Sequence, residues 1–278
     1  MIKLENIQVV GWEPSIRGMR NPKNSWDRMD SYSTYIEDPE TLQTAEFEFF
    51  VGENDHKLMM TLAKGGPVHA KYRRMLLVFV DITAPLYWWK EYDTYKVGTV
   101  ANSCSTMHKI HSKPFEVSDF SVEDLGIDIP AEWNDGEECY LNLWEERFKD
   151  VVSLLENARI KYNNETNPEL KKKFWRVMIQ YLPSSYNQKR TVMLSYETLA
   201  NIYEWRRNHK LTEWHTFCDW IKSLPYSEII TQPIVEKSKK IDIVEIIKVI
   251  NELKSQDKGY GYNHAMDDVL DFLNNKEK

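Results

Sequence analysis

The stretch Met75-Leu-Leu-Val-Phe-Val-Asp-Ile-Thr83 leads directly into Ala84-Pro85-Leu-Tyr-Trp-Trp-Lys-Glu-Tyr92, and together they carry the strongest signal for the fold. An apolar run rich in valine, isoleucine and phenylalanine predicts a β-strand. Proline is favoured at the first position of a helix, because its missing N–H would have no intrahelical partner there. We therefore expect a strand over 75–83 that feeds into an aromatic helix starting near Pro85 and running to Tyr95.

Weaker patterns extend this core in both directions along the chain. Residues 2–10 and 45–51 alternate between apolar and polar side chains, which predicts two further strands. Residues 11–39 are turn-rich and polar, and a loop of that length usually binds a ligand or packs on a partner. Helical periodicity predicts helices over 55–64 (capped by Asn54), 141–162, 169–181, 198–207, 211–224, 241–254 and 264–274. Few strands and many helices, which dominate the second half, indicate the α+β class.

The composition is that of a globular protein. The chain has 278 residues, of which 42% are hydrophobic, and Lys+Arg 36 against Asp+Glu 43 leaves a net charge of −7. Such a composition argues against disorder, and no apolar run is long enough to span a membrane. Mild acidity argues against general binding of DNA or RNA. The 3 cysteines form no disulfide or zinc pattern, and no secretory leader is recognisable, so we expect a cytoplasmic protein.

A polar segment after the aromatic helix is the first candidate for chemistry. Between Asp93 and Lys113 the sequence gathers hydroxyl groups, one amide, a glycine and the lysines Lys96, Lys109 and Lys113. Hydroxyl and backbone N–H donors with nearby lysines suit an anion such as phosphate. A solvated, hydroxyl-rich loop explains the same composition equally well, and no P-loop or dinucleotide-binding motif is present.

Single reactive side chains give no complete motif. His69, His108 and His111 have no further ligand at a metal-binding spacing, so we expect no metal site. Cys104 would be a nucleophile only with a base that the sequence does not identify. Glu91 lies beside an aromatic stripe, which is more typical of a core than of a cofactor site. Arg206 ends a predicted helix, where a cation is an ordinary structural feature unless it faces a pocket.

Three segments taken together resemble the flavin-dependent thymidylate synthases (ThyX). That family has, in order, a Gly-His turn, a strand, an Ala-Pro helix start and the motif R-H-R-x-x-S-x-N-E-x-S-x-R. This chain follows the same order with His69, the strand over 75–83, Ala84-Pro85, and then Thr94-Tyr-Lys96 and Asn102-Ser-Cys-Ser105. Leu182-Pro183 and the helix that contains Asn201 and Arg206 match its later Leu-Pro and N-x-R…R elements in spacing. The likeness covers residues 45–225 approximately and rests on order and spacing more than on identities.

The resemblance implies roles for individual residues. Arg206 matches the arginine that binds and polarises the uracil ring, and it would be the catalytic residue, because a guanidinium fork on a pyrimidine carbonyl stabilises negative charge on the ring. Asn102 and Ser105 match the motif when one residue is inserted before Asn102. The implied substrate-binding residues are Ser105, Glu91 and Arg176, and the implied cofactor-binding residues are His69, Lys96, Asn102 and Asn201.

The chain departs from the family pattern at several charged positions. Thr94-Tyr-Lys96 replaces R-H-R, Ser103 replaces the motif glutamate, and Met107 or His108 replaces its last arginine. Ser195-Tyr-Glu197 replaces N-x-R, and Ile179 replaces an arginine before Leu-Pro, although Arg176 stands one helical turn earlier. These exchanges remove cations that would bind phosphate groups. Nearby cations that could replace them are Lys71, Arg73, Arg74 and Lys109.

The resemblance also implies an architecture and an activity. We expect a ThyX-like domain over 1–235, with a central, mostly antiparallel sheet flanked by helices, a C-terminal helical extension over 236–278, and a homotetramer with shared sites. The implied reaction is the methylation of dUMP to dTMP, with methylenetetrahydrofolate as carbon donor and NADPH as reductant of FAD. Two alternatives stay open: a related flavin enzyme that modifies another pyrimidine nucleotide, and a nucleotide-binding or assembly protein without catalysis.

Overall fold

A computed structural model describes residues 2–36, 46–125, 143–232, 250–252, 267 and 269. The contacts within the chain define two compact units, Met1–Pro233 and Ile234–Lys278. The predicted boundary at 235/236 and most of the two predicted C-terminal helices fall outside the described residues, and the predicted domain division stays a prediction. None of the described helices is both long and apolar enough to cross a membrane.

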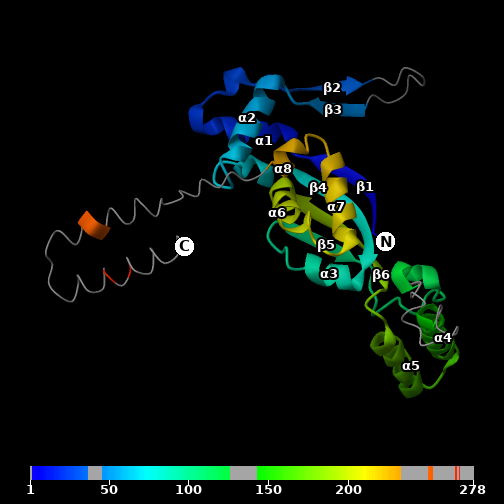
Figure 1. The fold of residues 1–278 in the computed structure, drawn as a ribbon. Coiled ribbons are helices and arrows are strands. Elements are labelled where there is room, and N and C mark those ends of the chain that lie inside the picture. Colours follow the sequence, from blue (N-terminus) through cyan, green and yellow to red (C-terminus); the bar gives the residue numbers. More distant parts are fainter. Residues whose placement is uncertain are drawn as a thin grey trace. The chain divides into compact units, whose positions relative to one another are not determined.

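A four-stranded antiparallel sheet forms the centre of the fold (Figure 1). Its strand order is β1-β4-β6-β5, so the central strand β4 pairs with both β1 and β6. Strand β4 ends at Pro85, and α3 begins at the next residue, which confirms the predicted passage from strand to aromatic helix. The bounds are β1 Lys3–Val10, β4 Leu77–Pro85, α3 Leu86–Tyr92, β5 Thr99–Ser103 and β6 Asn187–Ser195.

The side chains of β4 alternate between a buried face and a more exposed face of the sheet. Val78, Val80 and Ile82 are buried, whereas Phe79 and Asp81 point to the other face, as the two-residue period of a strand requires. Helices α3, α6 and α7 cover the buried face (Figure 1), and their tryptophans and aliphatic side chains complete one hydrophobic core. The bounds of two of these helices are α6 Tyr196–Arg206 and α7 Thr212–Ser223, and the other helices of the unit include α2 Glu53–Lys64 and α8 Glu228–Thr231.

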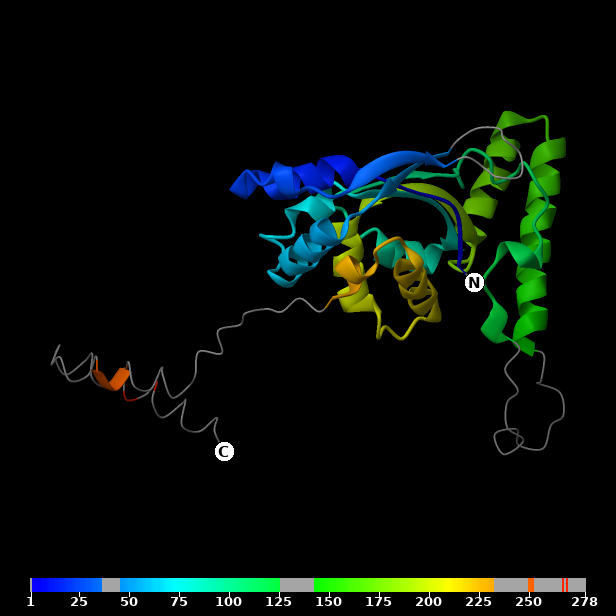
Figure 2. The ribbon, with the colours of Figure 1, turned by 90° about the horizontal axis from the view of Figure 1, so that it is seen from above.

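Two helices of the second half form a hairpin with a core of its own. Helices α4 (Leu143–Asn164) and α5 (Pro168–Tyr181) run side by side (Figure 2). Asn167 caps α5, since its side-chain oxygen accepts from the backbone N–H groups of Glu169 and Leu170 at 3.0 and 3.2 Å. The hairpin and the loop before it share a small apolar core that includes Leu155, Met178 and Phe120. These helices confirm the predicted helical portion.

The expectation of a loop over residues 11–39 is wrong. The segment contains α1 (Trp12–Arg20), two short 3-10 helices (Asn21–Lys23 and Trp26–Arg28) and β2 (Tyr32–Ile36), which pairs with β3 (Glu46–Phe50). Helix α1 buries Ile16 and Met19, which are one turn apart, although Pro14 and Gly18 lower its helix propensity. Tertiary burial therefore outweighs local propensity here.

Strands β5 and β6 are absent from the sequence prediction. Strand β6 begins Asn187-Gln-Lys-Arg-Thr191, and its polar residues contact charged partners across the sheet rather than solvent alone.

Helix α2 also starts differently from the prediction, because Asn54 does not cap it. The carboxylate of Asp30, from a distant turn, accepts hydrogen bonds from the backbone N–H groups of Asn54 and Asp55 instead.

Candidate functional site

Glu91 and Arg206 come from two helices that the sheet sets side by side. Trp88, Trp89 and Tyr92 face the core, which leaves Glu91 on the open side of α3. Helix α6 starts at Ser195, whose hydroxyl oxygen accepts from the backbone N–H of Thr198 at 3.2 Å, and Arg206 is its last residue.

The Arg206 guanidinium is fixed by hydrogen bonds and by two aromatic rings. Its Nη1 donates to Oε2 of Glu91 at 2.8 Å, and its Nε donates to the hydroxyl of Tyr95 at 2.9 Å. The guanidinium carbon lies 4.8 Å from the ring centre of Trp214 and 5.5 Å from that of Tyr95, which adds cation–π attraction. The Nη2 group donates no hydrogen bond to any described residue. Arg206 is therefore held in place, and one of its donor groups stays available.

The Glu91 carboxylate is held through one oxygen only. Besides Arg206, Oε2 accepts from Nε1 of Trp214 at 2.9 Å and lies 3.4 Å from Nε2 of His209. Nδ1 of His209 accepts the backbone N–H of Leu211 at 3.2 Å, so a neutral His209 ring carries its proton on Nε2, toward Glu91. Oε1 accepts no hydrogen bond from the described residues, and the Glu91 side chain is 33% exposed. Two hydrogen-bond donors, Arg206 and Trp214, thus orient the carboxylate, and Oε1 of Glu91 and Nη2 of Arg206 have no hydrogen-bond partner among the described residues.

A neighbouring hydrogen bond positions the helix that carries Trp214. Tyr87 on α3 donates to Oε1 of Glu213 on α7. Burial raises the pKa of Tyr87, and so does the bond to the Glu213 carboxylate, so the phenol remains a donor at neutral pH. This bond joins α3 to α7 beside the Glu91 carboxylate.

A second place contains one of the four predicted cofactor-binding residues, Asn201, whereas His69, Lys96 and Asn102 do not line it. A pocket of about 410 Å³ lies between β4, β6 and the start of α6, and Asn201 lines it. Val97, which follows Lys96, also lines the pocket. So does Pro67, which is two residues before His69. The other lining residues are Arg74, Leu77, Gly98, Met193, Ser195, Glu197 and Thr198.

The acid at position 197 is explained by a buried ion pair. Nε of Arg73 donates to Oε2 of Glu197 at 2.8 Å, and its Nη1 donates to the carbonyl of Ile229 at 3.1 Å. Arg73 is 1% exposed and Glu197 is 8% exposed, so each neutralises the other in the interior. Arg73 is therefore unavailable to replace a missing phosphate-binding cation. Arg74, by contrast, is exposed and lines the 410 Å³ pocket.

Ser105 lies in a third place, a smaller pocket lined by three lysines. The pocket has a volume of about 270 Å³, and Lys109, Lys113 and Lys189 line it without any acidic residue. Hydrogen bonds with Asp119 and Asp81 raise the pKa values of Lys113 and Lys189, so both stay cationic. The Ser105 hydroxyl oxygen accepts from the backbone N–H groups of Met107 and His108 at 3.2 and 3.0 Å. The polar segment of the sequence thus folds into a cavity suited to an anion.

The remaining predicted residues lie apart from these pockets. Arg176 is exposed on α5, whose Trp175 donates to the carbonyl of Met107 at 2.8 Å, so this helix adjoins the turn that follows Ser105. Asn102 is exposed on β5, opposite Thr191. No pocket found in the described part of the chain contains all of the predicted residues. Among the described residues, no group of three histidine, cysteine, aspartate or glutamate side chains could hold a metal ion.

Sequence reasoning missed His209 and Trp214, which orient Glu91. No local pattern marks them, because their role depends on the turn that folds α7 back beside α6. Tyr95 stands where the resemblance implies a histidine, and in this chain its hydroxyl binds Arg206.

Comparison with known proteins places these features on a familiar scaffold. No family model matches the sequence, and no curated protein matches it by sequence. Among solved structures, ThyX from Helicobacter pylori with FAD and dUMP matches with TM-score 0.54 and 14% identity, over 83% of this chain and 97% of that one. The UMP/dUMP methylase PolB from Streptomyces cacaoi, bound with 5-Br dUMP, matches with TM-score 0.51 and 13% identity, over 83% and 94% of the two chains. The chain therefore has the mixed helical and antiparallel-sheet fold of the flavin-dependent thymidylate synthases.

Proposed function

We propose that the protein binds a pyrimidine nucleotide through Glu91 and Arg206 and methylates it in a flavin-dependent reaction. The observation that carries the proposal is the ion pair of Glu91 and Arg206, in which Oε1 of Glu91 and Nη2 of Arg206 have no hydrogen-bond partner among the described residues. A uracil ring presents the complement, an N3–H donor next to a carbonyl acceptor. Since Glu91 accepts and Arg206 donates, the two residues would orient the ring, and Arg206 would stabilise negative charge on its carbonyl.

In this proposal the flavin would bind in the 410 Å³ pocket. Asn201, Ser195 and Thr198 would supply polar groups for hydrogen bonds, and Arg74 would supply exposed positive charge for phosphate groups. Lys96 is exposed next to the lining residue Val97 and would add a second charge. FAD, when bound, would supply the hydride chemistry, with methylenetetrahydrofolate as carbon donor and NADPH as reductant. The nucleotide phosphate would bind in the pocket that Ser105 and Lys109 line. The proposal includes a homotetramer, in which several chains would contribute to each site.

One observation favours a second candidate, a nucleotide-binding protein without catalysis. The ion pair of Arg73 and Glu197 stands where the resemblance implies an arginine free to serve the cofactor. Retained flavin separates the two candidates. The methylase proposal expects the purified protein, or the protein mixed with FAD, to show a bound-flavin absorption spectrum, and the non-catalytic candidate expects dUMP binding without flavin.

Calorimetry with dUMP tests the proposed ring site. Arg206→Lys keeps the positive charge but loses the planar fork, so we expect the affinity for dUMP to fall about 10-fold to 150-fold, the scale of one charge-assisted hydrogen bond. Arg207→Lys is the matched control, because Arg207 is adjacent and pairs with Glu204 on the surface. Equal affinities of the wild type and Arg206→Lys, or the absence of dUMP binding by the wild type, would refute the proposal.

The tetramer is proposed on the resemblance and on the outer face of the sheet. Phe79 and Val100 are exposed there by 37% and 60%. Apolar side chains gathered on an exposed face are typical of an interface between proteins. Light scattering should therefore give a mass well above 33.0 kDa, and a monomer mass at micromolar concentration would contradict shared sites.

A further inference from the structure

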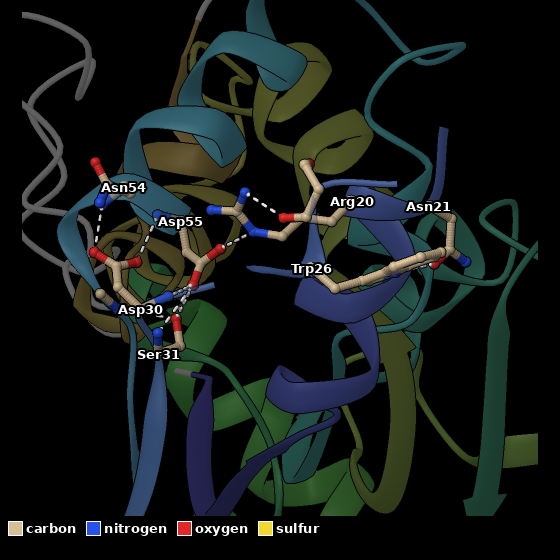
Figure 3. Close-up of polar contacts among 9 residues, drawn as sticks. Arg20, Asn21, Trp26, Asp30, Ser31, Asn54 and Asp55 are labelled. Carbon is tan, nitrogen blue, oxygen red and sulfur yellow. Dashed lines mark hydrogen bonds and ion pairs between the residues drawn. The ribbon is translucent and has the colours of Figure 1, made fainter. Parts of the chain in front are cut away.

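The segment over 11–36 contains a buried polar network that fixes an arginine (Figure 3). Asp55 is fully buried, and its Oδ1 accepts from Nε of Arg20 at 2.6 Å. Its Oδ2 accepts from the backbone N–H groups of Asp30 and Ser31, each at 3.0 Å, and from the Ser31 hydroxyl at 2.6 Å. Both carboxylate oxygens are thus engaged, and Arg20 is held by a partner that four hydrogen bonds fix in place.

The same network leaves part of Arg20 unused. Its Nη1 donates to the carbonyl of Ser25 at 3.2 Å, whereas Nη2 donates to no described residue (Figure 3). Arg20 is 4% exposed, and this small exposed portion lines a pocket of about 800 Å³. A nearly buried guanidinium with a fixed direction loses little conformational entropy when it binds an anion.

The pocket is positive in a chain whose net charge is −7. Arg20, Lys23 and Arg28 line it against the single acid Asp27, and the amides of Asn24 and Asn54 add neutral donors. Lys23 and Arg28 are exposed, and neither forms an ion pair with a described residue. The backbone N-terminus of α2 is not part of this positive site, because Asp30 already accepts from its N–H groups.

We infer that this pocket binds the phosphate groups of a small polyphosphorylated molecule. Arg20 supplies a directed donor, Lys23 and Arg28 supply charge, and three cations match the charge of two adjacent phosphates better than that of one. Inorganic pyrophosphate and a nucleoside diphosphate share this chemistry. Trp26, which is 49% exposed and bonded to Asn21 at 2.8 Å beside the pocket, offers a ring face for a base.

Calorimetry with inorganic pyrophosphate and with ADP tests the inference. We expect saturable binding of pyrophosphate to the full chain, weakened at least tenfold in the double variant Lys23→Gln/Arg28→Gln. The control is the single variant Lys57→Gln, which should bind pyrophosphate like the wild type. Lys57 is an exposed lysine on α2 that pairs with Glu53 and lies outside the pocket. Both substituted side chains are exposed, so the far-ultraviolet circular dichroism should not change.

The two ligands identify the source of the phosphates. Equal affinities assign the pocket to the diphosphate group alone, and tighter binding of ADP, lost in Trp26→Ala, assigns it to a nucleotide. Absence of saturable pyrophosphate binding at low salt, or unchanged binding in the double variant, would overturn the inference. The lining residues include none of those proposed to bind the pyrimidine ring, so Arg206→Lys should leave pyrophosphate binding unchanged.

Discussion

Nη1 of Arg206 lies 2.8 Å from Oε2 of Glu91, although the two residues are 115 positions apart in the chain. The same oxygen accepts from Trp214, so a single carboxylate oxygen joins α3, α6 and α7. An exposed ion pair of this kind adds little to stability, whereas here the carboxylate is oriented by several donors at once. The ion pair of Arg206 and Glu91 is therefore better suited to positioning a ligand than to holding the helices together.

Removal of the indole donor should weaken this arrangement measurably. Trp214→Phe deletes the Nε1–H that binds Glu91 and preserves most of the aromatic packing. We expect the free energy of unfolding to fall by about 1.5–3 kcal/mol more than in a matched variant that loses no hydrogen bond. Trp88→Phe is that control, since Trp88 is equally buried, packs on Trp214 and has no hydrogen-bond partner for its Nε1 among the described residues. Urea unfolding of both variants measures the difference, and equal losses would contradict it.

The buried pair of Arg73 and Glu197 should respond differently to single and double substitution. Glu197→Leu leaves a buried guanidinium without its counter-charge, which costs about 3–5 kcal/mol of unfolding free energy. Arg73→Leu combined with Glu197→Leu removes both charges, and we expect it to recover most of that loss. Denaturant unfolding of the single and double variants completes the cycle. A single variant as stable as the wild type would show that the pair is not desolvated.

Flavin binding should depend on Arg74 more than on its neighbours. Arg74→Gln removes the exposed cation of the 410 Å³ pocket, so we expect FAD to bind about tenfold more weakly. Lys71→Gln is the control, because Lys71 is exposed in the same short helix and does not line the pocket. Quenching of FAD fluorescence on titration with protein measures both affinities. Equal affinities for the two variants would place the phosphate groups of FAD elsewhere.

The stability at low pH should depend on Asp81. Hydrogen bonds from Thr191, Asn6 and Lys189 lower the pKa of Asp81 to about 2, from an ordinary value of 3.8. A folded-state pKa below the unfolded value stabilises the protein above pH 3.8, and this contribution disappears as the pH falls toward 2. Asp81→Asn should therefore flatten the decline of unfolding free energy between these two values. Asp219→Asn, an exposed carboxylate on α7, is the control. A decline equally steep in Asp81→Asn would contradict the assignment.

The parts of the fold that sequence could predict are those with local signals. The apolar run of β4 and the proline at its end specify a strand and a helix start without reference to the rest of the chain. Strand β6 escapes prediction because its polar side chains find partners only across the sheet, as Thr191 does when it donates to Asp81 at 2.6 Å. Helix α1 escapes because Pro14 and Gly18 argue against a helix that burial of Ile16 nevertheless stabilises.

The candidate site shows the same limit. The resemblance supplied Glu91 and Arg206, and the structure brings them together. It could not supply His209 and Trp214, because their contacts with Glu91 arise from the return of the chain between α6 and α7. The substitution of an arginine by Glu197 looked like a lost function in the sequence, and its physical reason is the buried Arg73 opposite.

Comparison of dUMP with its N3-methyl derivative tests most directly whether Glu91 and Arg206 bind the edge of a pyrimidine ring. Methylation of N3 removes the only donor that Oε1 of Glu91 could accept from uracil and leaves the phosphate and sugar unchanged. Calorimetry on the wild-type protein should show N3-methyl-dUMP binding at least tenfold more weakly than dUMP, whereas Glu91→Ala should bind the two ligands with similar affinity. Equal affinity of the wild type for both ligands would show that the ring is not held by this pair of residues.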